Sequence, residues 1–271
     1  MRRSCLTLLG LLCVETAWAG APISGRDQQM VFPREPIQAV AARAYHQELA
    51  SMAKRGELDL NPETLHRIRK ICSQLIAQAI RIKPAAAAWP WEIHITSDPE
   101  VAAYSMGGGK LMISTHFIES YQLNDEELAV ALAHEIGHII AEHVREQVSM
   151  AALMNTSVPL HARKVADVIN AMQSDISVYL RLQPLSRLQE MEADDIGIEL
   201  AARAGISPAA VISFYSKLAK TDSGQSMFDT HGSITQRVKF VDSMANYAWP
   251  VYEASRKAKP LPHYTFADAS P

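Results

Sequence analysis

Five consecutive residues, His134-Glu135-Ile136-Gly137-His138, constrain this chain more than any other segment. On a helix, His134 and His138 lie one turn apart on the same face, and Glu135 lies about 100° further round. The residues before the motif are largely apolar and rich in alanine, so we expect a buried helix. Buried imidazole and carboxylate groups need polar partners, and one metal ion held by both histidines would supply them.

The residues around this motif also predict a helix. Asn124 or Asp125 is a suitable N-cap, and the acidic residues that follow favour the positive end of the helix dipole. Residues 125–150 contain no proline, so we expect the helix to run through the whole segment. His143, nine residues after His134, would then lie on the opposite side of the helix, as a surface histidine or as a partner of a ligating residue.

Length and composition fit one globular domain. The chain has 271 residues, of which 48% are hydrophobic and 20% charged, as is usual for globular proteins. Its formal net charge is −3 and no long basic run occurs, which argues against a nucleic-acid partner. We expect a single domain over residues 20–249 and a proline-rich C-terminal tail over residues 250–271. No internal apolar run approaches the roughly 18 residues that a transmembrane helix needs.

Residues 1–19 have the features of a cleaved secretory signal peptide. Two arginines precede an apolar run, and the sequence Ala-Trp-Ala that ends at Ala19 resembles a cleavage site. Lipid attachment at Cys13 is not expected, because the bulky Leu12 stands where a small residue is usual. Export without an anchor predicts a periplasmic protein.

Apolar periodicity and helix-breaking residues predict a mainly helical α+β fold. Besides the motif helix, we expect helices over residues 37–55, 62–83, 161–182, 185–204, 208–220 and 234–247. Short strands are expected over residues 91–95, 101–105 and 110–115, with a tight turn at Gly107-Gly108-Gly109. These strands would form a small β-sheet beside the motif helix.

Two histidines leave a catalytic zinc site incomplete, because such sites usually have three protein ligands. The pattern in which a third histidine ligand at position 144 follows a glycine at position 141 is excluded, since the chain has Ala141 and Val144 there. Glu190 and Asp194 are four residues apart and share a helix face, whereas Glu192 points roughly the other way. One carboxylate could bind the metal while the other accepts the N–H of a ligating histidine. An acidic, solvent-exposed helix face is the alternative, and the histidine motif favours the metal.

The two motifs together, His134–His138 and Glu190-x-x-Ala193-Asp194, resemble those of HtpX-like gluzincin metallopeptidases, a family that includes the CAAX prenyl endopeptidase, BepA and LoiP. The resemblance covers about residues 90–245. It implies a zincin-like domain with endopeptidase activity and one Zn²⁺ per chain, in a stand-alone periplasmic member. The implied zinc ligands are His134, His138 and Glu190, with Asp194 contacting a ligand from behind.

The resemblance also implies roles for residues outside the metal site. Glu135 would be the general base, and the segment with Tyr104 and the glycines Gly107, Gly108 and Gly109 would pair with an extended substrate. His231 or Arg237 would donate a hydrogen bond to the reaction's oxyanion. His231 lies in a Gly- and Ser-containing loop, and an alternative is that this loop folds over the cleft and occupies the metal's open position.

Protein or peptide substrates follow from this resemblance, and quality control of misfolded envelope proteins, with outer-membrane proteins as candidate substrates, is the implied role. A protein of another class remains as the alternative: a zinc-containing, non-catalytic chaperone or adaptor for envelope proteins. Structural zinc sites usually have four protein ligands and no open position. A structural site has no need for a general base, so Glu135 argues for the enzyme.

Overall fold

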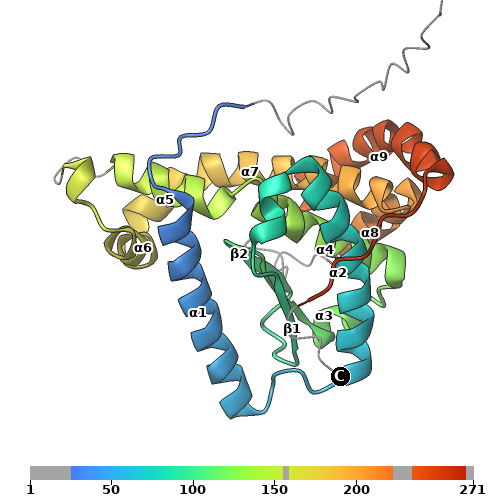
Figure 1. Cartoon of the computed structure of the whole chain (residues 1–271), viewed down its shortest axis with the longest axis horizontal. Helices are drawn as coiled ribbons and strands as arrows, with labels where there is room; N and C mark the ends of the chain where they lie inside the picture. The colour runs from blue at the N-terminus through green and yellow to red at the C-terminus, as the bar shows by residue number, and fades with distance from the viewer. Residues whose placement is uncertain (1–25, 155–158, 222–233, 267–271) are drawn as a thin grey trace, which may run out of the picture.

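The computed structural model describes residues 26–154, 159–221 and 234–266. Helices dominate this part of the chain, and one three-stranded sheet lies among them (Figure 1). The elements are α1 (Arg34–Arg55), α2 (Pro62–Ile82), η1 (Pro84–Ala88), β1 (Glu92–Thr96), β2 (Ala103–Met106), β3 (Lys110–Ser114), α3 (Thr115–Ser120), α4 (Asp125–Ile140), α5 (His143–Met154), η2 (Leu160–Ala162), α6 (Val165–Ser174), α7 (Ile176–Arg203), α8 (Pro208–Thr221) and α9 (Ile234–Lys257). The predicted mainly helical α+β class is confirmed.

The sheet has the strand order β1-β3-β2, so that β2 forms one edge among the described strands. β1 runs parallel to β3, and β2 runs antiparallel to it. The turn from β2 to β3 requires glycine, because Gly108 and Gly109 have φ angles of 84° and 86°. A Cβ on Gly109 would also lie 2.9 Å from the ring of Trp91.

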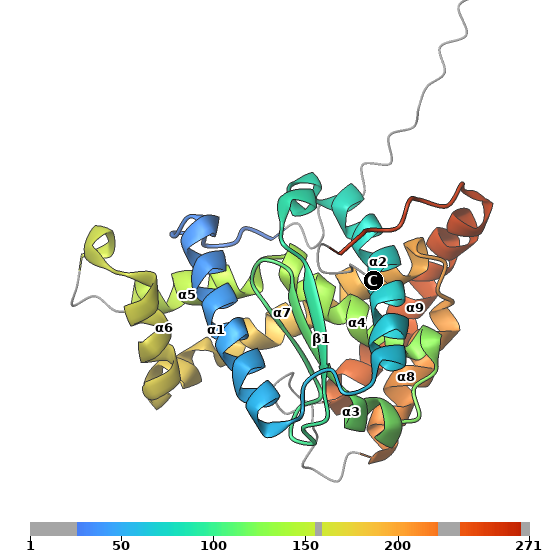
Figure 2. The same ribbon diagram turned by 60° about the horizontal axis from the view of Figure 1, so that its bottom comes forward.

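Helix α4, which carries the histidine motif, lies in the centre of the molecule. It packs against α7 and α2 and against α8 and the edge strand β2. Asn124 caps it in a capping box: its side chain accepts from the Glu127 N–H at 3.0 Å, and the Glu127 carboxylate accepts from the Asn124 N–H at 3.0 Å. Figures 1 and 2 show α5 and α6 at one end of the molecule and α8 and α9 at the other.

The expectation of one continuous helix over residues 125–150 is wrong. α4 ends at Ile140, and Glu142 takes a left-handed conformation with φ of 57° before α5 begins. The Glu142 carboxylate accepts hydrogen bonds from Arg34 and Arg145 and from Lys83. Burial opposes its ionisation, but these bonds, with those from Arg34 and Lys83 the strongest, lower the pKa of Glu142 to about 2. Three cations therefore hold the residue at which the chain turns.

Two prolines lie inside helices that the sequence analysis ended too early. α7 begins at Ile176 and runs through Pro184, where a boundary was expected. α9 runs through Pro250 to Lys257, although its expected end was residue 247 and a proline-rich tail was expected from residue 250. A proline removes one backbone hydrogen bond, and the packing of α7 against α4, α5, α6 and α9 outweighs that loss. Among the described helices, none is long and apolar enough to cross a bilayer.

Candidate metal and catalytic site

Helices α4 and α7 cross with almost no space between their backbones. A Cβ on Gly197 would lie 2.8 Å from the backbone nitrogen of His134, and a Cβ on Gly137 would lie 2.8 Å from the carbonyl oxygen of Ala193. Real Cβ atoms essentially never come so close to backbone atoms. The two glycines therefore permit the crossing that places Glu190 over the histidine motif.

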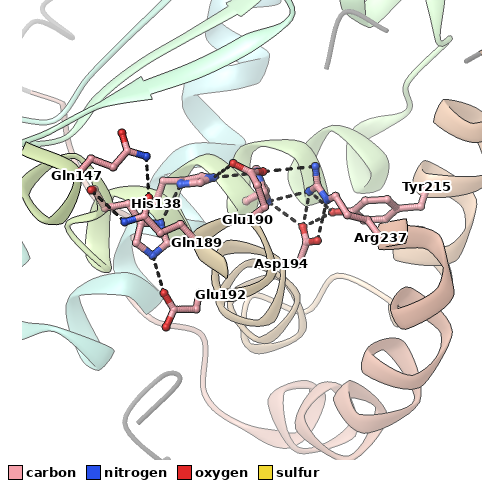
Figure 3. A network of polar contacts seen from close by, with 10 residues as sticks. His138, Gln147, Gln189, Glu190, Glu192, Asp194, Tyr215 and Arg237 are labelled. Atoms are coloured by element: carbon pink, nitrogen blue, oxygen red, sulfur yellow. Dashed lines mark hydrogen bonds and ion pairs between the residues drawn. The ribbon is translucent and has the colours of Figure 1, made fainter. Parts of the chain in front are cut away.

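Three side chains converge at this crossing (Figure 3). His134 Nε2 lies 3.1 Å from His138 Nε2 and 3.3 Å from Glu190 Oε2. Glu190 Oε1 lies 3.4 Å from His138 Nε2. Ligand atoms around a tetrahedral zinc ion, with bonds of about 2.0–2.1 Å, are about 3.3–3.4 Å apart. The separations and the donor types therefore fit a zinc ion, and one coordination position would be left beyond these three ligands.

Asp194 fixes the orientation of the first histidine. His134 Nδ1 lies 2.9 Å from Asp194 Oδ1, so its N–H donates to the carboxylate and the lone pair on Nε2 faces the other two ligand atoms. Arg237 donates to both oxygens of Asp194, at 2.8 and 2.5 Å, and the Tyr215 hydroxyl donates to Oδ1. Burial would raise the pKa of Asp194, but the charge of Arg237 and the bond from His134 hold it well below its usual range.

The charges of the site favour a bound cation. Burial lowers the pKa of His138 to about 4, so this ring is neutral and its nitrogen can bind a metal. Burial and the charge of Arg237 also lower the pKa of His134, but the bonds to Asp194 and Glu190 outweigh them and raise it to about 9. The buried carboxylates of Asp194 and Glu190 thus favour a positive charge next to His134. A bound metal ion would supply this charge in place of a proton.

Glu135 is buried, with 2% of its surface exposed, on the helix that carries both histidines. Its charge partly offsets the lowering of the His138 pKa by burial, as a carboxylate near that ring would. The Glu135 carboxylate therefore lies close enough to His138 to affect its charge.

Comparison with known proteins decides the family. The profile of Peptidase family M48 matches residues 62–245, more than half of the chain. The chain belongs to peptidase family M48. The resemblance to gluzincin metallopeptidases that the motif residues carry is therefore confirmed at the level of the family.

Several curated proteins are similar to this M48 member. The mitochondrial metalloendopeptidase OMA1 of Arabidopsis thaliana is 32% identical over 154 residues, which are 56% of this chain and 31% of that protein. The metalloprotease YcaL of Escherichia coli is 28% identical over 210 residues, 74% of this chain and 81% of YcaL. The metalloprotease LoiP of the same organism is 27% identical over 157 residues, 56% of this chain and 60% of LoiP. The chain thus spans less than two thirds of OMA1 and of LoiP.

The expected substrate segment lies next to the metal site. Tyr104 is on the edge strand β2, and its hydroxyl donates to Glu48 of α1 at 2.5 Å. Gly107 and Gly108, in the turn after β2, line a small pocket together with His138. Gly109 lies at the far end of that turn and contacts Trp91.

The two candidates for the oxyanion donor have different outcomes. His231 lies outside the described residues, so its position and that of its loop stay predictions. Arg237 is buried behind Asp194, and it also donates to the Tyr215 hydroxyl at 2.8 Å. Its Nη1 lies 3.6 Å from Glu190 Oε2. These contacts favour a role in holding Asp194 and Glu190.

The sequence analysis missed three residues of the site, which are Tyr215, Glu192 and Gly197. Tyr215 of α8 gave no motif signal, and Glu192 was expected to point roughly away from the metal. His143 was expected either as a surface histidine or as a partner of a ligating residue, and it contacts His138. Gly197 did leave a signal: it follows Glu190 by seven residues and Asp194 by three, so it extends the same helix face. A small residue at that position indicates the close crossing of a second helix.

Replacing Gly197 by alanine is expected to force α4 and α7 apart, because the new methyl group meets the backbone of His134 rather than a movable side chain. Overpacking of this kind destabilises a protein by about 1–3 kcal/mol. We expect a lower melting temperature and a lower zinc content than in wild type. Gly107→Ala is the matched control for both measurements, since its Cβ would have its nearest neighbours 3.8 Å away. Equal melting temperatures of the two variants would contradict the close crossing.

Proposed function

We propose that this M48 member is a zinc-dependent endopeptidase. The observation that carries the proposal is the convergence of His134, His138 and Glu190 at separations of 3.1–3.4 Å, with Glu135 on the same helix as the two histidines. A zinc ion bound there would act as a Lewis acid and lower the pKa of a coordinated water. Glu135 accepts a proton from the attacking water and returns it to the leaving amine nitrogen.

The edge strand supports a peptide substrate. An extended peptide can add to the open edge of a sheet through backbone hydrogen bonds, and β2 is such an edge among the described strands. Tyr104 and the turn with Gly107, Gly108 and Gly109 would then lie along the bound peptide. His231 remains the proposed donor to the oxyanion, and Arg237 the second candidate.

The proposed setting is the periplasm, with misfolded envelope proteins as substrates. The basic, apolar and small residues of segment 1–19 support export. The two Escherichia coli relatives carry the name metalloprotease, which supports a protein substrate.

Removal of the metal tests this proposal. The protein without its signal peptide (residues 20–271) is incubated with casein, with and without 1,10-phenanthroline, and its zinc content is measured. We expect the chelator to reduce cleavage at least about 100-fold and added zinc to restore it, because water without a Lewis acid is a poor nucleophile. The non-chelating isomer 1,7-phenanthroline is the control.

Cleavage that persists in metal-free protein would overturn the proposal. Bound zinc without any cleavage would instead favour either an enzyme whose His231 loop occupies the metal's open position or the non-catalytic chaperone or adaptor.

A further inference from the structure

His143 lies directly behind the metal-facing histidine His138. α4 ends at Ile140, and the left-handed turn at Glu142 folds the chain back before α5 begins. As a result, His143 Nδ1 lies 2.9 Å from His138 Nδ1, and the two rings are nearly perpendicular, at 77°. His143 is only 1% exposed, so water does not replace this contact.

The partners of His143 determine which of its nitrogens carries hydrogen. His143 Nε2 lies 3.2 Å from Glu192 Oε2, and since an ionised carboxylate only accepts, this nitrogen donates. Nδ1 of His143 is then the acceptor, and the hydrogen between the two rings belongs to Nδ1 of His138. In this tautomer the lone pair of His138 is on Nε2, the atom that faces His134 and Glu190.

Glu192 is itself held by the N-terminal segment. Arg26 donates through Nε and Nη2 to the two oxygens of Glu192, at 2.9 and 2.7 Å, and it also bridges to Glu146. Gln189 Nε2 donates to the same Glu146 carboxylate at 2.7 Å. Bidentate, charge-assisted bonds of this kind fix geometry as well as charge. In Figure 3, Glu192 and Asp194 lie on opposite sides of helix α7.

We propose that His143 is a positioning residue for the metal site, which fixes the ring and the tautomer of His138 through its acceptor Nδ1. The inference rests on the proposed zinc-dependent function. Each histidine of the site then has its own carboxylate and arginine: Asp194 and Arg237 directly for His134, and Glu192 and Arg26, through His143, for His138. Partners of this kind are typically worth 10–100-fold in metal affinity.

Two conservative variants separate the acceptor of His143 from its donor. His143→Asn places an amide oxygen near the position of Nδ1 and keeps an acceptor for His138. His143→Gln places its amide nitrogen near the position of Nε2 and keeps only the donor to Glu192. Zinc affinity is measured by competition with a chromophoric chelator, and the absorption spectrum of the Co²⁺-loaded protein reports the ligand geometry.

We expect His143→Gln to bind zinc about 10–100-fold more weakly than wild type, with shifted Co²⁺ bands, and His143→Asn to lose less than about threefold. His66→Gln, at an exposed histidine of α2, is the control and is expected to match wild type in both measurements. Thermal unfolding of each variant establishes that it is folded when its zinc affinity is measured.

Unchanged affinity and spectra in both His143 variants would overturn the inference and leave the zinc site standing. Equal losses in both variants would also overturn it, because His143 would then act through packing rather than through its acceptor. A wild-type protein that binds no zinc would overturn the inference together with the proposed function.

Discussion

Replacing Glu135 by glutamine is expected to reduce casein cleavage by about a thousandfold, within the 10²–10⁴-fold range of general acid–base catalysis. The amide has almost the same shape as the carboxylate, but it cannot take a proton from the attacking water. Zinc content should stay at the wild-type level, because the three proposed ligands are untouched. Cleavage rates and zinc content measured on the same preparations test both parts of this expectation.

Glu126→Gln is the matched control for this variant. Glu126 is on the same helix, and its replacement by glutamine removes the same charge. It is exposed in the first turn, far from the motif. We expect it to cleave casein at the wild-type rate. A Glu135→Gln protein that also does so would place the general base elsewhere in the molecule.

The geometry of the metal site was predictable because helix periodicity alone determines most of it. His134 and His138 are four residues apart on α4, and Glu190 and Asp194 are four residues apart on α7. Each pair therefore shares a helix face whatever the rest of the chain does. Only the crossing of the two helices depends on tertiary structure. Gly197 is the one residue of α7 discussed above whose small size indicates that crossing.

The contacts behind the ligands could not be predicted in the same way. His143 reaches His138 only because the helix breaks at Glu142, and no proline or glycine marks that break. The break is held by partners far away in sequence: Arg34 is 108 residues from Glu142, and Lys83 is 59 residues from it. Local propensity contains no information on such partners, so a continuous helix was the best expectation from the sequence.

The contacts of the N-terminal segment could not be predicted from the sequence either. The described part of this segment, residues 26–33, has no helix. Nothing in its composition indicates that Arg26 reaches two buried carboxylates on α5 and α7. Those carboxylates are nearly inaccessible to water, and burying them unpaired would be costly. Glu146 and Glu192, which lie 120 and 166 positions away in the sequence, therefore require Arg26 as a partner.

Removing the Glu190 carboxylate is expected to lower zinc affinity more than removing any group that supports the ligands. We expect Glu190→Gln to lose about a thousandfold, because an amide is a poor zinc ligand, and Asp194→Asn to lose about 10–100-fold. Competition with a chromophoric chelator measures both. Asp195→Asn, at the exposed neighbour on the same helix, is the control and should match wild type.

The order of these two losses distinguishes the ligand from its support. A larger loss in Asp194→Asn than in Glu190→Gln would mean that Asp194 binds the metal. The structure argues against that assignment, because both oxygens of Asp194 accept from Arg237 and one also accepts from Tyr215. The oxygens of Glu190 instead lie 3.3 and 3.4 Å from the Nε2 atoms of the two histidines, at the spacing of ligands that share one metal ion.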